Sequence, residues 1–201
     1  MPPRTRMAPD ERRGQLIDTA ARAFAAQPYD AVRMDEIATQ ASVSRGLLYR
    51  YFPTKRDLFA AVYRRAASDL LEVNRFDSEG ELTDQIAAGL DAHLDYFEAN
   101  RHTVVTANRT LAGDPLIQAI INDEFIELRD RFVAATRLSG HSRDLAAAAV
   151  LAWLRFVGAL CMDWLTSATI SRDDVRKVCL EALRGILLGV APALTDTSTP
   201  H

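Results

Sequence analysis

The chain has 201 residues, of which 48% are hydrophobic, and it carries 24 Lys and Arg against 27 Asp and Glu. This apolar content is ample for a packed core, so a soluble globular protein of one large domain or two small ones is expected. Cys161 and Cys179 lie far apart in the sequence, so neither a disulfide framework nor a CxxC metal or redox pair is indicated. With no secretory signal, a cytoplasmic location is expected.

The charge is distributed unevenly along the chain. Residues 1–65 carry 12 Lys and Arg against 7 Asp and Glu, whereas residues 66–201 carry 12 against 20. A basic N-terminal third on an acidic body is typical of a protein that meets a polyanion with one end.

Apolar residues recur at helical spacing and alternating β-branched runs are missing, so the chain is predicted to be all-α. Pro28 helps to end the first helix and Pro53 ends the third. Thr54 is placed to cap the next helix, with Asp57 three residues on as its capping partner. The expected helices span about residues 9–27, 34–40, 44–52, 54–72, 82–100, 103–112, 115–138, 143–168 and 172–190.

One stretch, residues 145–165, is apolar enough to be mistaken for a membrane span. Arg155 lies at its centre, where insertion into a bilayer costs roughly 2.5 to 3.5 kcal/mol, and Asp163 lies near its end. We therefore interpret it as a buried interface helix and expect no membrane association.

The two short helices at 34–40 and 44–52 are joined by a three-residue turn, which predicts a helix-turn-helix at about 33–52. Leu48 and Phe52 share the inward face of the second helix, because residues four apart lie on one side of a helix. In this motif the second helix enters the major groove of DNA.

The outward face of the second helix carries the groups that DNA contacts require. Ser44 is expected to cap the helix, and Arg45 to reach guanine or a phosphate. Thr54 and Lys55, with the free amides of the next helix, form a second predicted phosphate site. The full set of predicted DNA contacts is Arg33, Ser44, Arg45, Gly46, Leu47, Tyr49, Arg50, Tyr51, Thr54 and Lys55.

Residues 12–63, RRGQLIDTAARAFAAQPYDAVRMDEIATQASVSRGLLYRYFPTKRDLFAAV, resemble the DNA-binding domain of the TetR family of transcriptional regulators. The resemblance implies an all-helical homodimer with an N-terminal three-helix domain and linker helix at 9–70. It also implies a larger helical ligand-binding and dimerisation domain at 71–194. The family's residues at the DNA commonly match Ser44, Arg45, Leu47, Tyr49 and Lys55.

The sequence departs from the family pattern at four positions. Pro28 replaces a helix-ending glycine, and Ser42 replaces the usual turn glycine, at a mild cost in backbone strain. Arg33 stands where threonine often caps the second helix. Leu47 replaces a frequent threonine, so a family operator sequence cannot be carried over.

The last two helices are rich in small and aliphatic residues, and the resemblance implies that they pair with those of a second copy into a four-helix bundle. Two-fold symmetry would then present two recognition helices to a palindromic operator. The predicted dimer interface consists of Ala148, Ala152, Ala159, Val175, Val178, Ala182, Ile186 and Val190.

An effector pocket is predicted in the C-terminal helices. A mostly apolar cavity with few polar groups suits a lipophilic small molecule. For each candidate lining residue, packing in an ordinary core is the favoured alternative. The candidate lining residues are His93, Phe97, Thr106, Asn108, Phe125, Trp153 and Phe156.

The sequence contains no nucleophile elbow, HExxH motif, CxxC pair or glycine-rich phosphate loop, so no enzyme, metal site or cofactor is predicted. The favoured function is a homodimeric repressor that a small effector releases from its operator. Two alternatives stay open at this stage, an activator of the same fold and a regulator without a small-molecule effector, whose C-terminal domain only dimerises or binds another protein.

Overall fold

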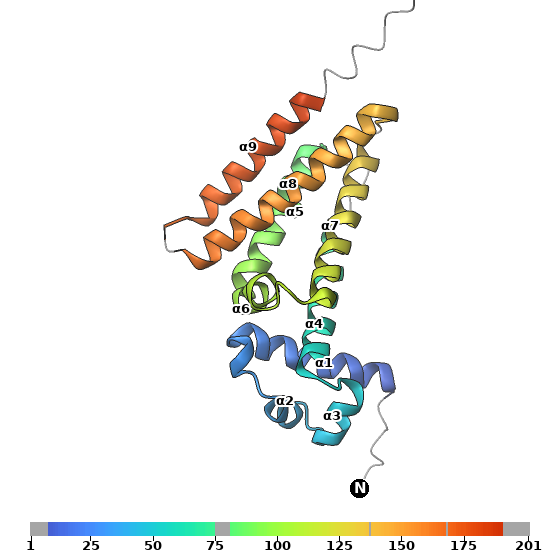
Figure 1. Ribbon diagram of the computed structural model, residues 1–201, viewed down its shortest axis with the longest axis vertical. Coiled ribbons are helices and arrows are strands. Elements are labelled where there is room, and N and C mark those ends of the chain that lie inside the picture. The colour runs from blue at the N-terminus through green and yellow to red at the C-terminus, as the bar shows by residue number, and fades with distance from the viewer. Residues whose placement is uncertain (1–7, 75–80, 137, 168, 191–201) are drawn as a thin grey trace, which may run out of the picture. The chain divides into compact units, whose positions relative to one another are not determined.

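A computed structural model describes residues 8–74, 81–136, 138–167 and 169–190. These residues form helices joined by short connections and contain no strand, which confirms the all-α prediction for the described part of the chain (Figure 1). The helices are α1 (Pro9–Ala26), α2 (Met34–Gln40), α3 (Arg45–Tyr51), α4 (Lys55–Val73), α5 (Leu82–Ala99), α6 (Arg101–Val105), α7 (Pro115–Ala135), α8 (Gly140–Thr166) and α9 (Arg172–Val190).

Three helical segments differ from their predicted bounds by more than two residues, and the first of them, expected at 115–138, ends at Ala135. The helix expected at 103–112 is α6 followed by a π-helical turn at Thr106–Thr110, in which Leu111 N–H donates to the Thr106 carbonyl at 2.8 Å. The helix expected from residue 143 begins at Gly140, whose positive φ of 54° suits a glycine.

The described residues fall into two compact units. The first combines residues up to Ala66 with Asn100–Ile120, and the second combines Ala67–Ala99 with residues from Ile121 onward. Asn100–Ile120 therefore belongs to the unit that contains the helix-turn-helix, where α6 packs on α1, although the sequence analysis placed it in the C-terminal domain. The exact bounds of 9–70 and 71–194 stay predictions, and residues 191–194 lie outside the described part.

The first unit is built around the apolar faces of α1 to α4. Leu16 and Phe24 of α1 and Leu48 of α3 are buried, as the four-residue spacing predicts. Phe24 meets Phe59 of α4 edge to face, with ring centroids 5.0 Å apart. Aromatic pairs of this geometry add about 0.5–1.5 kcal/mol beyond their buried area, so α1 and α4 are held firmly together.

The second unit contains an antiparallel pair, α8 and α9, which lie side by side (Figure 1). Trp153 of α8 donates its indole N–H to the Cys179 carbonyl of α9 at 2.9 Å. Arg176 of α9 forms a two-pronged ion pair with Asp91 of α5, at 2.7 and 3.0 Å. This pairing lowers the pKa of Asp91, so the carboxylate stays charged and ties α9 to α5.

The helix α8 is long and apolar enough to cross a membrane, and it is the one such helix among the described residues. Length and composition are weak grounds for a membrane span, since core helices of soluble proteins pass the same test. Only 28% of its most apolar window is buried within this chain, so much of its surface is free to meet a partner.

Candidate nucleic-acid interface and internal cavity

The turn between α2 and α3 depends on Ser42. This residue has φ of 55°, in the left-handed region where glycine is usual, and it is the one non-glycine residue with positive φ in the described chain. Val43 N–H donates to the Ala38 carbonyl at 3.0 Å and closes the turn behind it. The strained serine that the sequence predicted is therefore present, and the turn sets the angle at which α3 leaves α2.

The recognition helix α3 packs against the core with one face and is capped at its start. Leu48 is fully buried and Phe52 nearly so. Ser44 is the N-cap, and its hydroxyl oxygen accepts the Leu47 amide at 3.2 Å. An N-cap of this kind stabilises a helix by about 1 kcal/mol, which matters for a helix of only seven residues.

Arg45 is exposed, and two neighbours hold it. Its Nε lies 3.1 Å from Oδ1 of Asp35 on α2, and its guanidinium carbon lies 5.5 Å from the centre of the Tyr49 ring one turn further on. The contact is an electrostatic one, since Oδ1 of Asp35 accepts no hydrogen bond among the described residues. Asp35 was absent from the predicted site because its pairing with Arg45 depends on how α2 packs on α3.

The remaining predicted contacts of this motif lie on or near the surface. Arg33 is exposed, and its Nε lies 3.9 Å from Oε1 of Glu36. Arg50 is exposed and its guanidinium stands 5.9 Å from the Tyr51 ring. Gly46 is exposed, and an added Cβ would meet no other atom within 4 Å, so a ligand can approach its backbone closely. Leu47 is half-buried beside it.

Thr54 and Lys55 are directed at protein groups. The Thr54 hydroxyl donates to Asp57 at 2.8 Å and accepts the Asp57 amide at 3.1 Å, which confirms the predicted capping pair. The Lys55 ammonium donates to the carbonyls of Tyr29 and Val32, at 2.9 and 3.1 Å. Lys55 thus joins α4 to the segment after α1, and its role as a phosphate contact stays a prediction.

An ion pair that the sequence analysis missed joins the start of α4 to the start of α7. Arg56 donates to both carboxylate oxygens of Asp114, which also accepts the amides of Leu116 and Ile117 at 2.9 and 3.2 Å. The Arg56 guanidinium holds the pKa of Asp114 below its ordinary value. The two residues are 58 positions apart, so no local pattern could reveal the pair.

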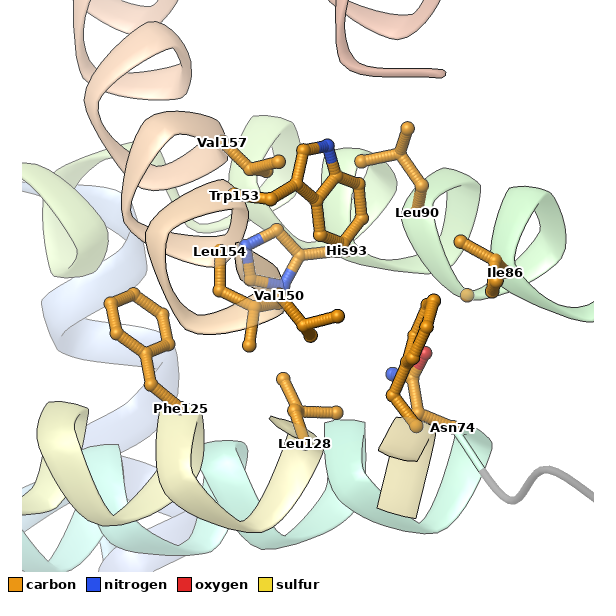
Figure 2. A pocket seen from close by; sticks show the side chains of 12 residues that line it. Asn74, Ile86, Leu90, His93, Phe125, Leu128, Val150, Trp153, Leu154 and Val157 are labelled. Atoms are coloured by element: carbon orange, nitrogen blue, oxygen red, sulfur yellow. The ribbon is translucent and has the colours of Figure 1, made fainter. Parts of the chain in front are cut away.

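The second unit contains a partly open cavity of about 50 Å³ (Figure 2). This is several times the roughly 10–15 Å³ that a single water needs. Side chains from α5, α7 and α8, together with Asn74 just after α4, converge on it in the close view. The lining residues are Asn74, Ile86, Gly89, Leu90, His93, Phe125, Leu128, Phe132, Val150, Trp153, Leu154 and Val157.

Three of the residues predicted for an effector pocket line this cavity, namely His93, Phe125 and Trp153. Phe97 lies behind it, with its ring centroid 4.0 Å from that of His93. Thr106 and Asn108 belong to the other unit and do not line the cavity. Phe156 is 40% exposed on α8. Most of the lining was missed, since an aliphatic residue on a helix looks the same at a cavity and in a filled core.

The predicted dimer residues divide into two groups. Val175 and Val190 are buried in the chain's own core, whereas Val178 is 46% exposed. Ala148, Ala152 and Ala159 are exposed, and Ala182 and Ile186 are half-buried. Larger exposed apolar side chains that were not in the predicted set share α8 and α9 with these residues, namely Leu145, Phe156 and Leu188.

Within the described ranges, no group of three or more His, Cys, Asp or Glu is placed to hold a metal ion. The first unit presents a capped, outward-facing helix with arginine and tyrosine side chains, and the second contains a partly open apolar cavity. The first arrangement defines a helix-turn-helix DNA-binding protein, since such a helix supplies both phosphate and base contacts.

Comparison with known proteins identifies the family. Residues 16–62 match the family model of the bacterial regulatory proteins of the tetR family. A TetR-family transcriptional regulator from Streptomyces coelicolor has the same fold, with a TM-score of 0.79 at 22% identity over 93% of this chain and 85% of that one. The match assigns residues 16–62 to the DNA-binding domain of the TetR family, and the relatives and the solved structure named here are transcriptional regulators.

Two curated relatives act in opposite directions. The HTH-type transcriptional activator FasR of Mycolicibacterium smegmatis is 36% identical over 95 residues, which are 46% of this chain and 43% of that protein. This match thus spans less than half the length of that relative. The HTH-type transcriptional repressor KstR of Rhodococcus jostii is 27% identical over 199 residues, 90% of this chain and 85% of that protein.

Proposed function

We propose that the protein is a cytoplasmic homodimeric repressor that binds a palindromic operator through α3 and leaves it when a small, largely apolar effector occupies the cavity. The observation that carries the DNA-binding part is the exposed, pre-positioned Arg45 beside Tyr49 on a helix whose opposite face is buried. A bidentate arginine contact is the commonest specific contact to guanine.

The exposed apolar faces of α8 and α9 support a homodimer. Val178 and Leu188 expose 46% and 67% of their surface on α9, and Phe156 exposes 40% on α8. Exposed apolar patches on a soluble protein mark interaction sites, and burying these side chains against a second copy removes them from water. A two-fold dimer would then place two copies of α3 about 34–36 Å apart, one turn of DNA.

The proposal of a repressor, rather than an activator, rests on the relative that aligns over more of the chain. The relative that aligns along nearly the whole chain is named a repressor, whereas the match to the named activator covers less than half of it. Release by an effector requires that the ligand binds more tightly to a dimer in which the spacing of the two α3 helices does not fit the operator. The helix α4 supports such a link, because it begins at Lys55 in the DNA-binding unit and ends beside Asn74 of the cavity.

The test is selection of bound sites from genomic DNA with the purified protein across a range of salt, followed by affinity measurements on the enriched site. We expect one palindrome to be enriched, and Arg45→Ala and Tyr49→Ala to lose specific binding while the dimer stays folded. Arg143→Ala is the matched control, because it removes the same charge from an exposed position in the other unit.

Unchanged affinity of both α3 variants for the enriched site would refute the assigned contacts. Binding without any enriched sequence, weakened steeply by salt, would mean that the basic N-terminal third attracts phosphate only. Enrichment of a site without two-fold symmetry would argue against the dimer. Reporter expression with the operator upstream separates a repressor from an activator.

A further inference from the structure

The cavity is apolar on most of its surface and carries no formal charge. Its described lining contains no Lys, Arg, Asp or Glu. Figure 2 shows aliphatic and aromatic side chains on all sides, with Asn74 toward one end and the His93 ring near Trp153 and Leu154. A charged ligand would therefore lose its hydration here and find no counter-ion, which is costly in an apolar site.

Two of the three polar side chains on this lining already have partners. Asn74 donates its amide to the Leu70 carbonyl at 2.8 Å, and its oxygen stands where a Cβ on Gly89 would come within 1.9 Å of it. The indole N–H of Trp153 is held by Cys179 of α9. Both residues therefore present mainly their apolar faces to the cavity.

His93 is different from these two. Its ring packs on Phe97, and among the described residues neither imidazole nitrogen has a hydrogen-bond partner. Protein encloses the ring, yet it keeps some accessible surface, which lies on the cavity. Burial lowers the pKa of His93 to about 4, so the imidazole is neutral at physiological pH. A neutral imidazole offers one N–H donor and one acceptor nitrogen.

We propose that the cavity takes an uncharged, largely apolar molecule and that His93 recognises its one hydrogen-bonding group, a hydroxyl or a carbonyl. This inference rests on the proposed effector function and specifies the class of effector. The imidazole nitrogens have no protein partner among the described residues, so a ligand that offers them a hydrogen bond gains affinity over its purely apolar analogue.

The test uses probes of one size and shape that differ in a single group. Cyclopentane, cyclopentanol and cyclopentanone compare an apolar ring with two uncharged polar ones, and cyclopentanecarboxylate and cyclopentylammonium add a charge of each sign. Binding to the full chain is measured by NMR on protein with 15N-labelled histidine, where the His93 imidazole signals report contact directly. The same probes are then added to the complex with the selected operator.

Three variants complete the design. His93→Phe keeps an aromatic ring against Phe97 and removes both nitrogens, while His93→Gln keeps a hydrogen-bonding group. His141→Phe is the control, since His141 is exposed at the start of α8 and outside the cavity. We expect cyclopentanol to bind more tightly than cyclopentane, and this preference to fall about 3- to 10-fold in His93→Phe only.

Other results overturn the inference. If His93→Phe keeps the preference for cyclopentanol over cyclopentane, His93 does not bind the polar group of the ligand. If either charged probe binds most tightly, the inferred ligand class is wrong. Failure of every probe to bind means that the cavity is not a ligand site. The proposed function is judged separately. If a neutral probe binds through His93 without changing operator affinity, the proposed release by an effector is wrong. If a charged probe releases the operator, release by an effector is supported and the inferred ligand class is wrong.

Discussion

Two enclosed ionisable side chains of the second unit should make opposite contributions to stability as the pH changes. His93 faces the cavity, and burial lowers its pKa from 6.5 to about 4. Glu124 on α7 is 7% exposed, one of its carboxylate oxygens has no partner among the described residues, and burial raises its pKa from 4.5 to about 7. Each shift corresponds to a differential free energy of about 3 kcal/mol.

The signs follow from proton linkage. Between pH 6.5 and 4 the unfolded chain takes up a proton that folded His93 rejects, so the stability from a neutral His93 is present above pH 6.5 and is lost toward pH 4. Between pH 4.5 and 7 folded Glu124 keeps a proton that the unfolded chain releases. Its contribution is therefore present below pH 4.5 and is lost toward pH 7. In the wild type the two slopes nearly cancel.

Single variants should expose each slope. We expect the free energy of unfolding of Glu124→Gln, relative to wild type, to rise by about 3 kcal/mol between pH 4.5 and 7. The free energy of unfolding of His93→Phe, relative to wild type, should fall by about 3 kcal/mol between pH 4 and 6.5. Subtracting the wild-type free energy of unfolding at each pH removes the contributions of other carboxylates, such as Asp91.

The assay is urea unfolding at fixed ionic strength and fixed protein concentration, at half-unit steps of pH, with the slope in urea checked for constancy. Flat difference curves, within about 0.5 kcal/mol, would refute the argument from burial. A flat curve for one variant alone would mean that water reaches that side chain in solution.

Three further substitutions test other features of the structure. Asp35→Asn removes the carboxylate that holds Arg45, and we expect it to weaken discrimination at the contacted base by roughly 1 kcal/mol, measured on base-substituted operators; undiminished discrimination would show that Arg45 needs no support. Asp114→Asn breaks the paired contact with Arg56 and should lower the Tm in thermal unfolding, whereas an unchanged Tm would mean that the pair is merely exposed charge. Val178→Glu places a charge on the exposed face of α9 and should shift sedimentation toward the monomer, with an unaltered dimer placing the interface elsewhere.

The helices and the recognition motif follow from local patterns in the sequence. Helical spacing of apolar residues, Pro53 after α3 and the Thr54–Asp57 capping pair act within a few residues, so their consequences can be read without knowing the rest of the fold. The same holds for Ser44 as N-cap and for the inward pair Leu48 and Phe52.

Only the tertiary structure decided how distant side chains are used. Lys55, predicted at a phosphate, donates to carbonyls 23 and 26 residues away, and Arg56 pairs with a carboxylate 58 residues away. His93 becomes a candidate for ligand recognition because helices from distant parts of the chain enclose it without giving it a partner. Local periodicity predicts which face of a helix is buried, but the groups that face it across the core depend on how the helices pack.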